Sequence, residues 1–304
     1  MKTVNIGHNL PASAIALGCM RISGMSPKDT AALIQTSLDA GIDFFDHADI
    51  YGGGESEVVF ARAMKDAGIG RDRLILQSKC GIRGGFFDFS KEHILSSAEN
   101  ILKRLQTDYL DILLLHRPDT LMEPEEVAEA FNILHTAGKV RYFGVSNQNS
   151  GQIKLLRKYV KQPLLVNQLQ FSIAHTGIID SGLNVNMKNP PSVDHDGDIL
   201  TFCRLENMTI QAWSPFQHGF FSGPFIGNEQ FTELNKQLAE TAKAYNITVE
   251  AAAIAWILRH PAHIQPVIGT TNKERVRAIA AAADVNLTRE EWYALYRAAG
   301  NQLP

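Results

Sequence analysis

Three absences narrow the classes of protein to which this sequence can belong. It contains only three cysteines, Cys19, Cys80 and Cys203, and no Cys-x-x-Cys pair, which favours a reducing compartment over a disulfide framework. No apolar run approaches the roughly 20 residues of a membrane span, and the N-terminus lacks the apolar segment of a secretion signal. We therefore expect a cytoplasmic protein that is not associated with membranes.

Charge of one sign is not in excess either, and several ligand-binding motifs are missing. The net charge of -3 gives no electrostatic reason to expect binding to nucleic acid. No Gly-x-Gly-x-x-Gly follows a strand pattern, so a Rossmann dinucleotide site is not indicated. The run Gly52-Gly53-Gly54 lacks the Gly-Lys-Ser/Thr ending of a phosphate loop and indicates a turn before a helix. No His-x-His closes the first strand pattern, which disfavours a metal-dependent hydrolase and predicts no metal site.

What the sequence does contain is a regular alternation of strand and helix patterns. Strands are predicted at residues 14–18, 42–45, 74–78, 110–115, 140–145, 164–170, 209–212 and 265–268. Helices are predicted between them at residues 27–40, 55–67, 91–105, 124–137, 150–160 and 231–245. Eight strands alternating with helices in 304 residues predict an α/β fold, a (β/α)8 TIM barrel forming a single domain over residues 1–304. A doubly wound sheet is the alternative, but it would normally show a linker, and none is present.

Three segments lie outside this alternation. Residues 2–13 alternate around Gly7-His8-Asn9 and predict a β-hairpin before the barrel. Residues 172–198, after the sixth strand, are rich in Gly, Asn, Asp and Pro, and a loop of this length is usually functional or disordered. Near the C-terminus, residues 249–260 and 288–299 are predicted as extra helices, the second opened by a capping box from Thr288 to Glu291.

Four polar residues fall at the ends of three successive strands. Asp46 ends the second strand pattern and Tyr51 follows it, Lys79 lies near the end of the third, and His116 ends the fourth. Each alone has an ordinary structural reading, as a helix cap, a loop aromatic, a snorkelling lysine or a buried histidine. In a barrel, however, all four would converge at the C-terminal face, where the active site lies.

This set of residues suits proton transfer from a phenol. A free tyrosine has a pKa near 10, which is too high for an efficient acid at neutral pH. A lysine ammonium beside Tyr51 is expected to lower that pKa, and Asp46 would keep the ammonium charged and in place. A neutral His116 could then hydrogen-bond a substrate carbonyl oxygen. The pattern therefore predicts a tyrosine general acid.

The same motifs resemble the signature of the aldo-keto reductase superfamily. The resemblance rests on Asp46 to Tyr51, the Lys79 strand and Leu113 to Pro118, and it extends to Gly144 to Asn147, Trp213 to Phe216 and Gly269 to Arg275. The likeness is greatest to bacterial oxidoreductases of that superfamily. It implies reduction of an aldehyde or ketone with a nicotinamide cofactor, with Tyr51 as proton donor, Lys79 and Asp46 tuning it, and His116 orienting the substrate.

A cofactor site is also indicated. The segment Gly269 to Arg275, where the eighth strand meets a helix, has a helix N-terminus and cations that suit a phosphate, although an ordinary helix cap is an equal reading. The resemblance implies nicotinamide contacts from Ser146, Asn147, Gln168 and Trp213, and pyrophosphate contacts from Ser214, Pro215 and Phe216. It implies 2′-phosphate contacts from Thr270, Thr271, Asn272 and Arg275, hence NADP(H) rather than NAD. The chain departs from common members at Gly269, often lysine, at Ala278 and Ile279, often Glu and Asn, and at Trp213, often tyrosine.

The substrate pocket is expected to be apolar. Its rim would comprise Met20, the 81–89 loop with Phe86 and Phe87, the long loop from residue 172, and the 218–225 segment, so a small-molecule carbonyl substrate with an apolar or aromatic group is plausible. Two other functions remain open. One is a Schiff-base aldolase or isomerase using Lys79 as nucleophile. The other is a regulatory protein that binds the nicotinamide cofactor without useful turnover.

Overall fold

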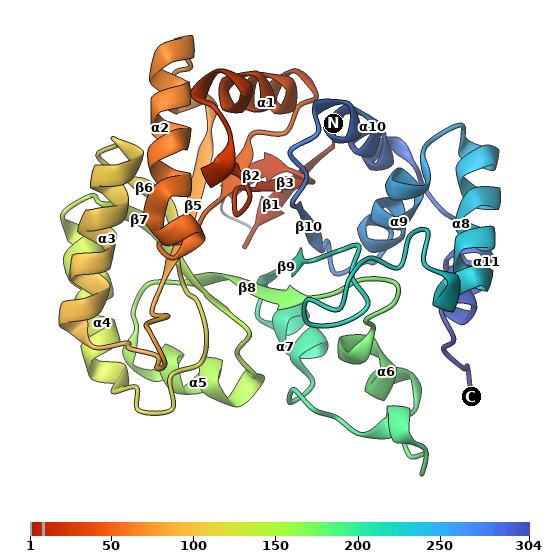
Figure 1. Ribbon diagram of the computed structural model, residues 1–304. Helices are drawn as coiled ribbons and strands as arrows, with labels where there is room; N and C mark the ends of the chain where they lie inside the picture. Colours follow the sequence, from red (N-terminus) through yellow and green to blue (C-terminus); the bar gives the residue numbers. More distant parts are fainter. Residues whose placement is uncertain (1, 8–9) are drawn as a thin grey trace.

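The computed structural model describes residues 2–7 and 10–304, and its centre is a closed barrel of eight parallel strands (Figure 1). Around the barrel the strand order is β10-β3-β4-β5-β6-β7-β8-β9, so each strand lies beside its neighbours in sequence and β10 closes onto β3. All eight predicted strands are present, with ends within two residues of the prediction. Their bounds are β3 (Ala16–Gly18), β4 (Phe44–Asp46), β5 (Ile75–Cys80), β6 (Leu110–Leu115), β7 (Val140–Ser146), β8 (Leu164–Gln170), β9 (Thr209–Trp213) and β10 (Gln265–Ile268).

Helices surround this barrel, as Figure 1 shows, and their apolar faces form the outer core against the strands. Strands such as β6, whose residues are all buried, are covered on both faces, which explains their unbroken apolar sequences. In the described part of the chain, no helix is both long enough and apolar enough to cross a membrane. The helices are α1 (Pro27–Asp39), α2 (Glu55–Ala67), α3 (Lys91–Leu105), α4 (Pro124–Thr136), α5 (Ser150–Tyr159), α6 (Gly177–Leu183), α7 (Ile199–Leu205), α8 (Thr232–Tyr245), α9 (Val249–Leu258), α10 (Lys273–Ala280) and α11 (Arg289–Ala298).

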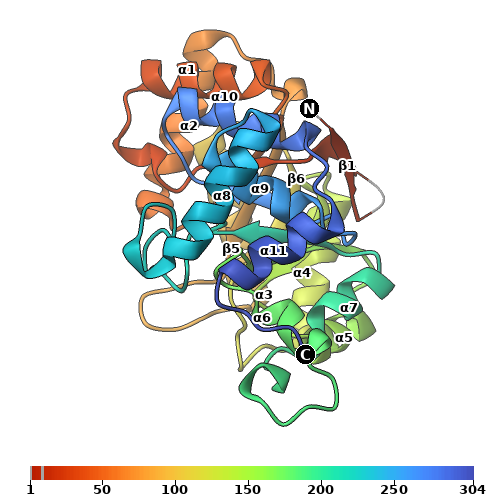
Figure 2. The ribbon, with the colours of Figure 1, turned by 90° about the vertical axis from the view of Figure 1, so that its right-hand side faces the viewer.

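The order of the helices before β10 differs in one respect from the prediction. Both α8 and α9 lie between β9 and β10, and it is α9 that packs against β10. Helix α9 is apolar on all sides and almost wholly buried, as a helix enclosed by other elements must be. The helices additional to the barrel pattern are therefore α8 and α11, and not α9 as predicted. Helices α8 and α11 pack side by side outside α9 (Figure 2).

An antiparallel hairpin closes the N-terminal end of the barrel. Its strands are β1 (Thr3–Ile6) and β2 (Leu10–Ser13), as predicted; of the expected turn residues, His8 and Asn9 lie outside the described residues. Ile6 and Ala12 of the hairpin belong to an inner apolar cluster with Phe44 and Val267 of the barrel strands. This cluster fills the N-terminal end of the barrel interior, which leaves the opposite, C-terminal end for a ligand.

The segment after β8 is not a plain loop. Residues 172–198 contain α6 and a short 3-10 turn at Pro190–Ser192, and α7 follows directly. Both helices have only seven residues, which is below the length at which periodicity identifies a helix. Contacts with the C-terminal helix hold α6 in place, because the Tyr296 hydroxyl donates to Asp180 Oδ1 at 2.8 Å.

Candidate active site

Three neighbouring strands bring the predicted polar cluster together. Asp46 ends β4, Lys79 lies near the end of β5, and His116 follows β6 directly. Lys79 Nζ donates to Asp46 Oδ2 at 2.8 Å, to the His47 carbonyl at 2.7 Å and to the Tyr51 hydroxyl at 3.2 Å. The three N–H bonds of the ammonium are thus all used, and the lysine is fixed beneath the phenol.

A turn of glycines places Tyr51 above the lysine. Gly52, Gly53 and Gly54 all have positive φ, at 60°, 66° and 94°, a conformation that residues with a Cβ rarely adopt. A Cβ at Gly52 would also lie 2.5 Å from the Cβ of Ser23. The predicted turn is confirmed, and it lets the chain reverse between the end of β4 and α2 while Tyr51 points back into the barrel.

The electrostatics of the cluster favour a charged lysine and a protonated tyrosine. Burial alone would lower the pKa of Lys79, but the Asp46 carboxylate and the Tyr51 oxygen outweigh it and hold that pKa above its usual value. For Tyr51, burial raises the pKa more than Lys79 lowers it, so the net shift is upward. Lys79 therefore lowers the pKa of Tyr51 as expected, but burial outweighs this effect, and the phenol keeps its proton at neutral pH.

His116 faces Tyr51 across the top of the site. The two rings are 6.2 Å apart between centroids and nearly perpendicular. Burial, followed by the charges of Lys79 and Arg117, lowers the pKa of His116 well below its usual value, so the imidazole is neutral at physiological pH, as predicted. Its Nδ1 is buried without a partner among the described residues, which leaves Nε2 as the nitrogen able to reach a ligand.

A second buried histidine, His47, lies behind the site and should make the free energy of unfolding depend on pH. His47 is fully buried, its ring packs on Phe60, and burial and then the Lys79 charge lower its pKa to about 3. Between that value and the ordinary pKa near 6.5, the unfolded chain binds a proton that the folded chain does not. The stabilising contribution is present above pH 6.5 and is lost as pH falls, by up to roughly 1.4 kcal/mol per pH unit.

We therefore expect His47→Leu to flatten the decline in unfolding free energy between pH 6.5 and 4, measured by urea denaturation. Replacement of the exposed His135 by leucine is the control and should leave the slope unchanged. His260, whose pKa burial lowers to about 4, adds a slope of the same sign in both proteins. An unaltered slope in His47→Leu would show that His47 is not protonated on unfolding.

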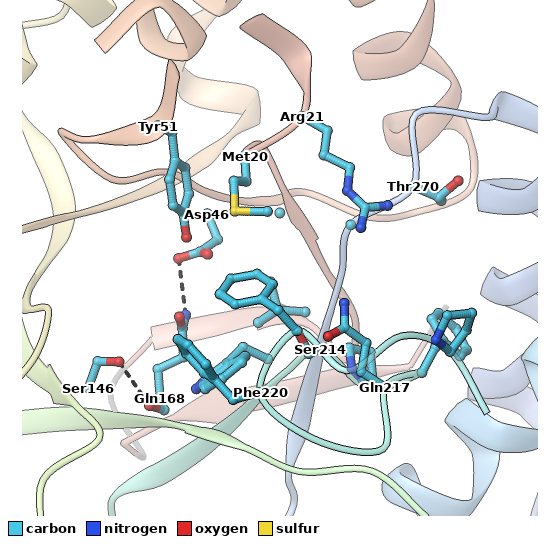
Figure 3. Close-up of a pocket in the computed structure, with 18 of the residues that line it drawn as sticks. Met20, Arg21, Asp46, Tyr51, Ser146, Gln168, Ser214, Gln217, Phe220 and Thr270 are labelled. Carbon is cyan, nitrogen blue, oxygen red and sulfur yellow. Dashed lines mark hydrogen bonds between the residues drawn. The ribbon is translucent and has the colours of Figure 1, made fainter. Parts of the chain in front are cut away.

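A cavity of about 840 Å³ opens over this cluster at the C-terminal face of the barrel (Figure 3). Asp46, Tyr51 and His116 line one end of it, and Thr270 and Arg275 line the other. Lys79 is fully buried and does not line the cavity. The polar cluster and the predicted phosphate segment therefore belong to one continuous cavity.

The middle of the cavity contains the residues predicted to hold a nicotinamide. Trp213 Nε1 donates to Asn147 Oδ1 at 3.1 Å, and Asn147 Nδ2 donates to Ser146 Oγ at 2.7 Å. Ser146 Oγ in turn donates to the Gln168 carbonyl at 2.9 Å. This chain of bonds fixes the Trp213 ring as one wall of the cavity, and all four side chains line it.

The turn after β9 leads toward the phosphate end. Ser214, Pro215 and Phe216 all line the cavity, and Ser214 has φ of 52°, an uncommon value for a serine that turns the chain sharply out of the strand.

At the phosphate end itself, Gly269, Thr270 and Arg275 line the cavity, whereas Thr271 and Asn272 do not. Asn272 is the N-cap of α10, because its Oδ1 accepts from the Arg275 backbone N–H. For this residue the alternative of an ordinary helix cap is therefore the one observed. Arg275 Nε lies 3.6 Å from Glu250 Oε1 and remains half exposed.

The substrate rim differs from the prediction at two residues. Met20 lines the cavity, but Phe86 and Phe87 do not. A backbone bridge between Ile82 and Phe87 turns the tip of this loop outward, and the two rings are 54% and 43% exposed. Ile82 is the residue of this loop that reaches the cavity. The aromatic side of the mouth is formed instead by Phe220 and Phe221, from the 218–225 segment.

Two arginines in the cavity escaped the sequence interpretation. Arg117 lies 5.6 Å from the Trp213 ring centre and 5.3 Å from that of Phe220, and Arg21 extends from beside Met20 toward Thr270 (Figure 3). Neither forms an ion pair with a side chain in the part of the chain that the structure describes. Each arginine directly follows a predicted site residue, Met20 or His116. This adjacency is the feature of the sequence that could have identified them.

Comparison with known proteins agrees with this geometry. The model of the aldo/keto reductase family matches residues 14–299. The chain is 37% identical to oxidoreductase YdhF of Escherichia coli, over 94% of this chain and 93% of that protein, and 34% identical to 6-dehydroglucose reductase of Agrobacterium fabrum, over 97% of both. The crystal structure of an aldo-keto reductase from Klebsiella pneumoniae in complex with NADPH is similar, with a TM-score of 0.78 and 28% identity over 97% of this chain and 94% of that one. The chain therefore belongs to the aldo/keto reductase family of oxidoreductases.

Proposed function

We propose that this protein uses NADPH to reduce an aldehyde or ketone to an alcohol, with Tyr51 as the proton donor and residues 1–304 acting as one domain. The observation that carries the proposal is the contact of Lys79 Nζ with both Asp46 and the Tyr51 hydroxyl, at the end of a cavity that continues to Arg275. Tyr51 holds its proton until a substrate oxygen accepts it. The neutral His116 orients that oxygen toward the phenol.

The cavity walls fit the cofactor. A carboxamide needs one acceptor for its N–H and one donor for its carbonyl oxygen. The Gln168 side chain offers an acceptor and the second N–H of Asn147 offers a donor, because its first is bonded to Ser146. Thr270 and Arg275 suit a 2′-phosphate, and Ser214 to Phe216 a pyrophosphate. When bound, NADPH supplies the hydride that reduces the carbonyl carbon.

The geometry disfavours the Schiff-base alternative. A lysine nucleophile must be uncharged and must reach the substrate. Lys79 has its three N–H bonds directed at protein oxygens, its pKa is raised, and it lies outside the cavity wall. A cofactor-binding regulator, the other alternative, would not need a proton donor held in this way, so the intact cluster favours a reductase.

Titration with NADPH and with NADH tests the proposal directly. Trp213 forms a wall of the cavity beside Asn147, so a nicotinamide bound there should quench its fluorescence. Trp213→Tyr, which keeps an aromatic wall, should bind NADPH but lose most of the quenching and thereby identify the reporter. If wild-type protein binds neither nucleotide, the proposed reduction has no hydride source and the proposal fails.

The choice of NADPH over NADH should depend on Arg275. We expect Arg275→Ala to weaken NADPH binding by about 10- to 100-fold, the size of a lost charged hydrogen bond, and NADH binding by less than about twofold. The loss is reinforced because Glu250, now without its partner at 3.6 Å, is left beside the phosphate.

The matched control for this variant is Arg277→Ala, an arginine of the same helix that is paired with Glu274 and does not line the cavity. Both dissociation constants should stay at the wild-type value in that protein. Equal losses for the two nucleotides in Arg275→Ala would show that Arg275 does not contact the 2′-phosphate.

A further inference from the structure

Below the polar cluster, a layer of glutamines crosses the barrel interior. Gln77, Gln168, Gln211 and Gln265 come from β5, β8, β9 and β10, and all are between 0% and 3% exposed. Strand register brings them to one level, because Gln211 pairs with Gln168 on one side and with Gln265 on the other, and Gln77 pairs with Asp46. The layer lies between the apolar plug at the bottom and the active site above.

These side chains form one continuous chain of hydrogen bonds. Gln265 Nε2 donates to the Ser13 carbonyl at 2.7 Å, and Gln211 Nε2 donates to Gln265 Oε1 at 2.8 Å. Gln211 Oε1 accepts from Gln77 Nε2 at 2.7 Å and from Gln168 Nε2 at 3.0 Å. Both of these amides also donate to Asp46 Oδ1, at 2.6 and 3.1 Å.

The two ends of the chain fix the direction of every amide within it. The Ser13 carbonyl and the Asp46 carboxylate can only accept hydrogen bonds, so an amide facing either of them must present its N–H₂ group. Gln265 therefore turns its oxygen to Gln211, and Gln211 turns its oxygen to Gln77 and Gln168. Turning any one of the four would set two oxygens against each other in a buried site.

Gln77 and Gln168, the two amides that donate to Asp46, differ in what their oxygens can bind. With both N–H bonds used, each has only its oxygen left. Gln77 Oε1 is buried without a partner in the described part of the chain, whereas Gln168 lies on the cavity wall and can offer its oxygen to a ligand. An unpartnered buried oxygen is costly and uncommon, so its presence indicates that the direction of the chain is maintained for another purpose.

We infer that this glutamine relay, anchored on the Ser13 carbonyl at the hairpin end of the barrel, makes Gln168 an obligate acceptor and so selects ligands that donate an N–H at this point. The inference rests on the proposed function, in which that ligand group is the nicotinamide carboxamide. Gln211 and Gln265 are positioning residues, since neither lines the cavity. Through the same bonds the relay supplies two N–H donors to Asp46 and keeps it an acceptor for Lys79.

The test measures discrimination between two cofactors with the purified full-length protein. In the 3-acetylpyridine analogue of NADPH a methyl group replaces the carboxamide N–H₂, so it cannot donate to Gln168. Its dissociation constant divided by that of NADPH, both from Trp213 quenching, is the readout. We expect a ratio of about 10 in the wild type, the size of one hydrogen bond to a buried acceptor.

Gln211→Met keeps the side-chain shape but removes the three relay bonds of Gln211. The variant is made in a Lys79→Met/Asp46→Leu background, because Asp46 Oδ1 would otherwise still hold the direction of the Gln168 amide at 3.1 Å. In that background the ratio should stay near 10 while Gln211 is intact, and adding Gln211→Met frees the Gln168 amide to turn. The ratio should fall to about 1 to 3, because the turned amide can donate to the acetyl oxygen. Thr209→Val is the matched control. It removes another buried bond of β9, from the Gly7 N–H to Thr209 Oγ1, outside the relay, and should keep the wild-type ratio.

The outcomes separate this inference from the proposed function. If the wild type binds NADPH but adding Gln211→Met to the background without Asp46 keeps the ratio near 10, or the wild type binds both cofactors equally, the relay does not set the polarity of Gln168. If the wild type binds no nucleotide, the proposed function itself fails. Should that variant not fold, Gln265→Met in the same background breaks the relay one residue further from the cavity, and the same fall in the ratio is expected.

Discussion

Tyr51→Phe should lower kcat for carbonyl reduction by about 10²- to 10⁴-fold while the dissociation constant for NADPH stays within about twofold. The phenol contacts Lys79 and lines the cavity, and burial keeps it protonated, so its oxygen is positioned to pass a proton to a substrate. The ring itself is retained in phenylalanine. Steady-state loss of reduced-nicotinamide absorbance with aromatic aldehydes gives kcat, and Trp213 quenching gives the affinity.

The structure of the variant should be little disturbed, which makes the kinetic result interpretable. Lys79 loses one hydrogen bond at 3.2 Å but keeps the shorter bonds to Asp46 and the His47 carbonyl. Tyr296→Phe is a matched control, because it removes a phenol that donates to Asp180 and neither residue lines the cavity, so it should not change kcat. Retention of more than about a tenth of wild-type turnover in Tyr51→Phe would rule out Tyr51 as the proton donor.

The barrel and the polar cluster could be predicted because their signals are local in sequence. Each strand is a short apolar run, and parallel neighbours necessarily present their C-terminal ends at one face. Asp46, Lys79 and His116 each end such a run, so their convergence follows from the fold class alone. The glycine turn that positions Tyr51 is likewise a local signal.

The features that could not be predicted depend on how strands and loops meet in three dimensions. Gln77, Gln211 and Gln265 are polar residues of buried strands, and only the register of the closed barrel joins them into a relay. The 81–89 loop has three phenylalanines, and the sequence does not show that Phe89 is the buried one. The pKa of Tyr51 also depends on burial, a tertiary property, which outweighs the effect of the nearby lysine.

Lys79→Met should have the largest combined effect, because it removes the residue that joins Asp46 to Tyr51. Asp46 is 2% exposed, and without its ion pair at 2.8 Å it becomes an uncompensated buried charge, so we expect a loss of about 3 to 5 kcal/mol of unfolding free energy. Turnover should fall at least as far as in Tyr51→Phe. Urea denaturation and initial rates measure the two losses, and Lys139→Met, at a surface lysine paired with Glu99, should show neither.

A second substitution separates the structural part of this effect from the chemical part. In Lys79→Met/Asp46→Asn the buried negative charge is gone, and an amide at position 46 can still accept from Gln77 and Gln168, so most of the lost stability should return. Turnover should not return, because no cation remains below the phenol. If activity recovered together with stability, Lys79 would act only by holding the fold, and the proposed tuning of Tyr51 by an ammonium would be wrong.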